Sequence, residues 1–149
     1  MMDQATLQHW VEANNFFQFM DSEERTHLYS FKDHWKFVKP GECVVRVGET
    51  DYGFFVIVKG TFSVIKPEDI FLAHLNPGDL FGEVSLKSRR KRYSNVVADE
   101  EGIVFKVDDI LLKKISPALH LKIKNQVIEV LIRRLDDMNQ RLVKLTRMR

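Results

Sequence analysis

The spacing of apolar residues changes twice along the chain and divides it into three zones. In residues 1–35, Leu7 and Val11 have helical spacing, which predicts a first helix. Asp21 and Glu24 then form the pattern of a capping box, in which each side chain accepts a hydrogen bond from the other's main-chain amide. The first zone therefore predicts two short helices.

Residues 36–108 have the shorter period of β-strands. Their apolar residues alternate or cluster over short runs, as in Val45, Val47, Phe55, Ile57, Phe62 and Val64. Turn signals recur between these runs, including Pro40-Gly41, Lys59-Gly60 and Pro77-Gly78. Short strands with this punctuation indicate a mainly β barrel or sandwich rather than βαβ units.

Residues 109–149 return to helical spacing, and Pro117 suits the first turn of a long helix. Six apolar residues follow the 3-4-3-4-3 spacing of a coiled-coil seam: Ile128, Leu131, Leu135, Met138, Leu142 and Leu145. This stripe can pack on the β zone of its own chain or pair with a second copy. A helix over residues 118–147 would be about 45 Å long, longer than a small β zone can cover, which favours a homodimer.

Composition fits a single soluble domain, spanning residues 1–149, without catalytic or metal chemistry. The 149 residues are 44% hydrophobic and 30% charged, and the net charge of +2 implies no strong field for nucleic acid or membrane. No apolar run approaches the roughly 20 residues of a membrane span. The start has no secretory pattern and Cys43 is the single cysteine, so we expect a cytoplasmic protein with Cys43 buried in a strand.

Catalytic and metal motifs are absent from the sequence. The five histidines have no metal-ligand spacing, and there is neither a Gly-x-Ser-x-Gly elbow nor a Walker loop, so neither a metal nor an enzyme is expected. The basic run from Arg89 to Lys91 is either a solvated face or a patch that attracts anions.

The stretch from His74 to Leu86, followed by Arg92, carries the candidate chemistry. Gly82 permits close approach of a ligand to the main chain. A short helix beginning there would direct free amides toward an anion, and Arg92 could grip the same anion with its planar fork. Glu83 would be repelled by that anion, so its carboxylate is suited to a sugar hydroxyl instead. Together these groups predict a site for a sugar phosphate of low charge.

This stretch resembles the phosphate-binding cassette of the cyclic-nucleotide-binding domain family, which includes the catabolite activator protein and the regulatory subunits of protein kinase A. The resemblance extends over nearly the whole chain, through Lys39-Pro40-Gly41-Glu42 and through turn glycines at the family's positions: Gly48, Gly60, Gly78 and Gly82. It implies a jelly-roll-like β-roll, or double-stranded β-helix, over residues 36–108, with N-terminal helices over 1–35 and C-terminal helices over 109–149.

The resemblance also implies roles for individual residues. Glu83 would bind the ribose 2′-hydroxyl, and Arg92 the cyclic phosphate. The main-chain amides of the phosphate cradle would be those of Val84, Ser85 and Ser94. Leu72 and Ala73 would line the base pocket, and Met138 and Asn139 fall where the activator branch contacts the purine.

The run from Lys91 to Asn95 departs from the family pattern. Lys91 replaces a proline, and Tyr93 replaces a small residue or the threonine that favours guanine, so cAMP is expected over cGMP. Tyr93 either covers the base or fills the pocket. In the first case the chain is a non-catalytic cyclic-nucleotide sensor that signals through its C-terminal helix; in the second it is a ligand-free dimerisation or scaffolding module. No DNA-binding domain is expected before the chain stops at Arg149.

Overall fold

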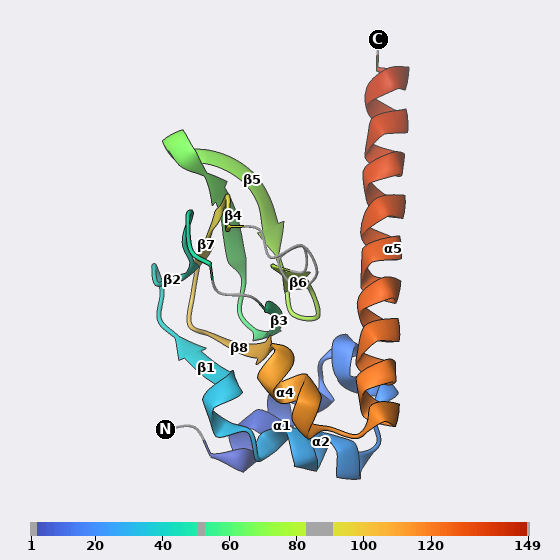
Figure 1. Cartoon of the computed structure of the whole chain (residues 1–149). Coiled ribbons are helices and arrows are strands. Elements are labelled where there is room, and N and C mark those ends of the chain that lie inside the picture. The colour runs from blue at the N-terminus through green and yellow to red at the C-terminus, as the bar shows by residue number, and fades with distance from the viewer. Residues whose placement is uncertain (1–2, 51–52, 83–90, 149) are drawn as a thin grey trace.

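The computed structural model describes residues 3–50, 53–82 and 91–148. Two four-stranded antiparallel sheets form a β-roll, with short helices at one end and a long helix alongside (Figure 1). The helices are α1 (Gln4–Glu12), η1 (Asn15–Phe19), α2 (Ser22–Tyr29), η2 (Lys32–His34), η3 (Pro67–Asp69), α4 (Asp109–Lys114) and α5 (Pro117–Arg147). The strands are β1 (Trp35–Val38), β2 (Cys43–Val45), β3 (Phe54–Lys59), β4 (Phe62–Lys66), β5 (Ile70–Leu75), β6 (Leu80–Phe81), β7 (Asn95–Ala98) and β8 (Gly102–Val107). The predicted fold class, mainly β with flanking helices, is confirmed.

The strand order is β1-β8-β3-β6 in one sheet and β2-β7-β4-β5 in the other. Strands far apart in sequence therefore pair: Trp35 of β1 lies opposite Phe105 of β8, and Phe62 of β4 lies opposite Ala98 of β7. Because β6 pairs with β3 and β7 pairs with β4, the strand within the predicted phosphate-binding stretch and the strand that follows Arg92 belong to the same roll.

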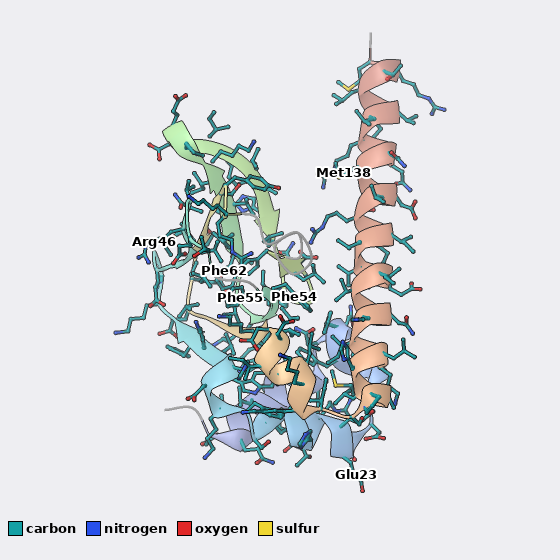
Figure 2. All side chains as sticks on the ribbon, in the orientation of Figure 1. Glu23, Arg46, Phe54, Phe55, Phe62 and Met138 are labelled. Atoms are coloured by element: carbon teal, nitrogen blue, oxygen red, sulfur yellow. The ribbon has the colours of Figure 1, made fainter. Side chains whose placement is uncertain are left out.

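β3 is buried on both faces and separates two apolar cores. Phe55, labelled in Figure 2, and Ile57 face the inside of the roll. There Phe55 stacks on Phe81, with ring centroids 5.1 Å apart. Phe54 and Val56 face the other way, into a core shared with the N-terminal helices, α4 and the first part of α5. The alternation of side chains along one strand therefore joins the roll to the helical end of the molecule.

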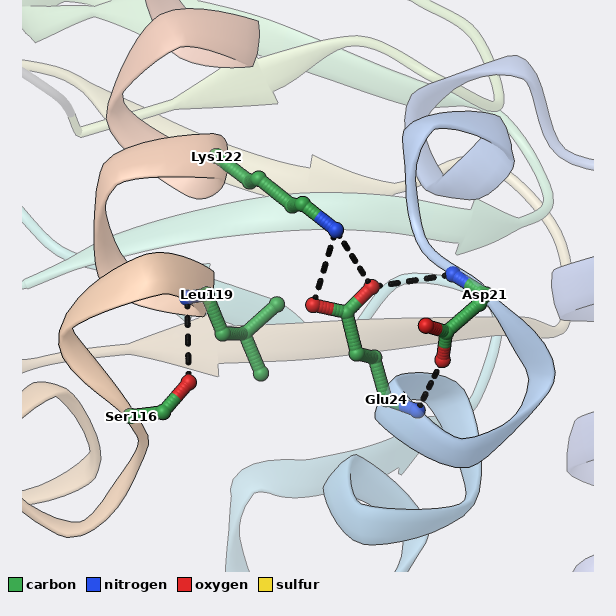
Figure 3. A network of polar contacts seen from close by, with 5 residues as sticks. All are labelled: Asp21, Glu24, Ser116, Leu119 and Lys122. Atoms are coloured by element: carbon green, nitrogen blue, oxygen red, sulfur yellow. Dashed lines mark hydrogen bonds and ion pairs between the residues drawn. The ribbon is translucent and has the colours of Figure 1, made fainter.

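The helix signals in the sequence are confirmed. Asp21 Oδ1 accepts from the amide of Glu24, and Glu24 Oε1 accepts from the amide of Asp21, completing the capping box (Figure 3). Pro117 occupies the first turn of α5, whose N-cap Ser116 accepts from the amide of Leu119. Cys43 is only half-buried, so the prediction of a buried thiol was wrong; its Sγ lies 3.0 Å from the carbonyl oxygen of Val45 at a bulge in β2.

The first turns of α5 are fixed to the helical end of the molecule. Leu119 and Ile123 are buried in the shared core, and Lys122 Nζ lies 2.9 Å from the Oε1 of Glu24 on α2 (Figure 3). From position 135 to position 148 every residue of the chain is exposed, so the second half of α5 extends along the roll without being buried against it (Figure 1). Within the described ranges, no helix combines the length and the apolar composition that crossing a membrane requires.

Candidate functional site

Arg92 is the one arginine with a buried side chain among the described residues, at 6% exposure. It lies just before β7, where its amide donates to the Glu49 carbonyl (2.9 Å) and its own carbonyl accepts from the Gly48 amide (2.7 Å). These two main-chain bonds fix the arginine to the loop after β2. Its side chain therefore enters the roll from a rigid position.

The guanidinium of Arg92 is held by main-chain oxygens. Nη1 donates to the carbonyl of Gly82 at 3.1 Å, and Nη2 donates to the carbonyl of Gly53 at 2.6 Å. Burial of a charged group is costly unless its donors are satisfied, and these carbonyls provide part of that satisfaction. A guanidinium has five N–H donors in a planar fork, a geometry that suits binding an anion beside the carbonyls.

Gly82 is required by this arrangement. Its φ is +84°, a left-handed conformation, and a Cβ added there would lie 2.6 Å from Nη1 of Arg92. The glycine therefore makes room for the guanidinium as well as for the turn of the chain.

A cavity of about 250 Å³ lies in the wall of the roll beside Arg92. It is lined by six residues of the predicted site: Leu72, Ala73, Gly82, Arg92, Tyr93 and Ser94. The remaining lining is apolar apart from Arg134 of α5. A single buried guanidinium among apolar walls suits a ligand that combines one anionic group with an apolar part.

The other predicted site residues do not line this cavity or cannot be placed. Met138 lies on α5 and lines a neighbouring groove of about 530 Å³ between α5 and the β5–β6 turn (Figure 2). Asn139 follows it and is exposed. Glu83, Val84 and Ser85 lie outside the described residues, as does most of the predicted basic run apart from exposed Lys91.

Tyr93 is 57% exposed at the rim of the cavity rather than folded over Arg92. The ammonium of Lys66 lies 5.6 Å from the centroid of its ring. The ring therefore leaves the cavity open.

Arg134 is a site residue that the sequence analysis missed. It lines both the cavity and the groove, and its Nη2 donates to the carbonyl of Leu80 in β6 at 2.6 Å. The sequence pattern that could have identified Arg134 is its helical spacing from Ile123 and Val130, which places Arg134 on the face of α5 that packs toward the roll.

Within the described part of the chain, no three histidine, cysteine, aspartate or glutamate side chains are grouped so that they could hold a metal ion. The site is thus built from one buried cation, main-chain groups and apolar walls.

The sequence profile named "Cyclic nucleotide-binding domain" matches residues 35–115, more than half of the chain. The chain belongs to the cyclic nucleotide-binding domain family. The matched residues include every described residue that lines the cavity except Arg134. This result confirms the family that the cassette resembled.

Individual relatives agree with the family assignment. The cAMP-dependent protein kinase regulatory subunit of Eremothecium gossypii is 26% identical over 109 residues, which cover 73% of this chain and 23% of that protein. The fold is shared with a cyclic nucleotide-binding domain from Methylobacillus flagellatus (TM-score 0.72, 19% identity, 94% of this chain and 82% of that one). It is also shared with the catabolite activator protein of Thermus thermophilus (TM-score 0.66, 21% identity, covering 88% of this chain and 62% of that one). The chain spans a third or less of the curated kinase relatives it matches.

Proposed function

We propose that this domain is a non-catalytic sensor that binds a cyclic nucleoside monophosphate in the cavity beside Arg92. The observation that carries the proposal is the buried guanidinium of Arg92 in an otherwise apolar cavity, within the residues that match the family. A cyclic phosphodiester has one negative charge, which one guanidinium can balance. The flat faces of the base then provide the apolar surface that the cavity walls can cover.

The individual roles are proposed from the family pattern, and the cavity supports those of the residues that line it. Arg92 binds the cyclic phosphate, with the Ser94 amide beside it, and Leu72 and Ala73 of β5 contact the base. Gly82 allows the phosphate to approach the main chain. The ribose contact of Glu83 and the amides of Val84 and Ser85 complete this proposal for positions outside the described residues. Met138 and Asn139 of α5 are proposed as base contacts from the family pattern alone, because neither lines the cavity beside Arg92.

We propose cAMP rather than cGMP as the ligand, because Tyr93 stands where the family's threonine favours guanine. The observed position of Tyr93 supports ligand binding, since its ring leaves the cavity open. We also place the protein in the cytoplasm, where its half-buried single cysteine would stay reduced.

Signalling is proposed to run through α5. Arg134 is bonded to Leu80 and lines the cavity, so a ligand that displaces or tightens this contact would change how α5 lies against the roll. A ligand shifts such an equilibrium only by its difference in affinity for the two settings of the helix.

The seam of α5 is proposed to pair two copies. Five of its six residues are at least half exposed: Ile128, Leu135, Met138, Leu142 and Leu145. At 3.6 residues per turn, the seam lies about a quarter turn around the helix from Val130 and Arg134, which face the roll. Leu131 packs partly against the chain's own core, so the exposed remainder of the stripe is the part proposed to meet the second copy.

A ligand-free dimerisation module is the second candidate, favoured by the same exposed seam and by the carbonyls that already engage Arg92. Calorimetry separates the two. The wild type should bind cAMP below millimolar concentration and non-cyclic 5′-AMP more weakly. Arg92→Ala should bind at least about 30-fold more weakly, because truncating one partner of a buried charged pair costs about 2 kcal/mol or more.

The exposed neighbour variant Lys91→Ala is the matched control and should bind as the wild type does. Circular dichroism of Arg92→Ala, Lys91→Ala and the charge-preserving Arg92→Lys shows whether each variant folds. A variant that folds but does not bind has lost binding alone. Failure of the folded wild type to bind any cyclic nucleotide would leave the second candidate. Dimerisation is tested by light scattering with Leu135→Glu, with Ile110→Glu as control because both side chains are 59% exposed.

A further inference from the structure

The rim of the cavity carries an exposed aromatic ring that the phosphate-binding chemistry does not use. Tyr93 is 57% exposed, and Leu72 on β5, two strands from β7 in the same sheet, is 48% exposed. Both side chains also line the cavity. An exposed apolar surface at the mouth of a cavity marks a place where a ligand with a flat apolar face can be covered.

The backbone holds Tyr93 at this rim. Arg92, the preceding residue, is bonded through both its amide and its carbonyl to the loop that contains Gly48 and Glu49. β7 begins two residues after Tyr93, at Asn95. The group that faces the phosphate and the ring at the rim are therefore neighbours on one fixed segment, at different depths of the same cavity.

Lys66 restrains the ring. It is the last residue of β4, the strand that pairs with β7, and its ammonium lies 5.6 Å from the centroid of Tyr93. At this distance a cation is attracted to the face of an aromatic ring. The interaction favours one orientation of the tyrosine and reserves one face of the ring for the lysine.

We propose that Tyr93 is the platform on which the ligand's base stacks, and that Lys66 is its positioning residue. This inference rests on the proposed function and deepens it. Stacking strength increases with the area of the flat base, so the platform makes the site prefer purine over pyrimidine 3′,5′-cyclic nucleotides. The base would lie between the free face of the Tyr93 ring and Leu72 with Ala73 of β5, while its phosphate lies at Arg92.

The test measures dissociation constants for cAMP, cGMP, cCMP and cUMP on the wild type and four variants. Tyr93→Ala should weaken purine binding about 5- to 150-fold, the range that stacking one base on an aromatic ring contributes. It should also reduce the purine preference, which is the dissociation constant for the pyrimidine nucleotides divided by that for the purine nucleotides. Tyr93→Phe should retain that ratio. Lys66→Met should reduce the purine preference in part. Lys66→Arg should retain it, because arginine also binds aromatic faces.

Phe71→Ala is the matched control, since Phe71 is a 51% exposed aromatic residue on β5 that contacts His74 instead of the cavity. It should leave all four constants unchanged. A Tyr93→Ala variant with an unchanged ratio, or with tighter binding, would overturn the platform while leaving Arg92-dependent binding intact. If the folded wild type binds none of the four nucleotides, the proposed function and the platform both fail.

Discussion

Replacing Gly82 by alanine tests whether the buried guanidinium of Arg92 lies where the structure places it. The added Cβ would lie 2.6 Å from Nη1 of Arg92 and 3.2 Å from the carbonyl oxygen of Gly53. The φ of +84° adds a penalty for any L-residue, about 1–2 kcal/mol. The variant therefore combines backbone strain with a direct collision against the site.

Gly41 provides the control that separates these two effects. Its φ is +83°, nearly that of Gly82, and a Cβ there would meet no atom of the described residues within 4 Å. Gly41→Ala should cost only the strain. Gly82→Ala should cost about 1.5–3 kcal/mol more, the value of a hydrogen bond from a charged donor, because the guanidinium must leave at least one of its carbonyl acceptors.

Urea denaturation of both variants gives the free energies of unfolding, and the difference between them isolates the collision. Under the proposed function, Gly82→Ala should also bind cAMP more weakly than Gly41→Ala. Equal losses of stability in the two variants would refute the buried position of the guanidinium beside Gly82.

Three further variants test other parts of the structure. Glu24→Gln keeps a capping side chain but removes the charge that pairs with Lys122; it should cost about 0.2–1 kcal/mol, and less in high salt, in urea denaturation. Asn14→Ala should cost about 1–3 kcal/mol in the same assay, because it removes the hydrogen bonds that the buried amide donates to the carbonyls of Ile57 and Val58 in β3, leaving the Ile57 carbonyl with the Gly78 amide. Burial raises the pKa of Asp108, but hydrogen bonds from the Leu111 amide and the His34 ring outweigh it and lower that pKa below its ordinary value. A lowered pKa in the folded state contributes stability that is present above about pH 3.9 and is lost as the pH falls further. Asp108→Asn should therefore reduce the decrease in the free energy of unfolding that the wild type shows at acid pH. An unchanged decrease would exclude Asp108 as its source.

The local features of the fold were predictable because they depend on neighbouring residues. The capping box of Asp21 and Glu24 needs only a spacing of three, and Pro117 marks the start of α5 by its missing amide. The change from helical to strand period likewise located the β-roll. These signals are read from short windows, where sequence distance and spatial distance agree.

The contacts that build the site span long stretches of sequence and were not predictable in the same way. The Nη2 of Arg92 donates to the carbonyl of Gly53, 39 residues away, and Lys66 meets Tyr93 only because β4 pairs with β7. The sequence marks such residues by type, as it marked Arg92, but pairing across the sheet decides which atoms they meet. Arg134 was missed because its bond to Leu80 depends on how α5 lies along the roll.

The same geometry limits where a ligand can act on α5. The first turns of the helix are fixed by buried Leu119 and Ile123 and by the ion pair of Lys122, so moving them would expose core surface. The residues from position 135 to 148 are exposed, so moving them would expose no core surface. Arg134 lies at the boundary between the two halves and lines the cavity. Under the proposed function, the ligand would therefore change the second half of α5, which carries most of the exposed seam, while the first half stays in place. Hydrogen exchange should then differ with and without cAMP in the turns after Arg134 and not in those around Ile123; protection changes confined to the first turns would contradict this division of the helix.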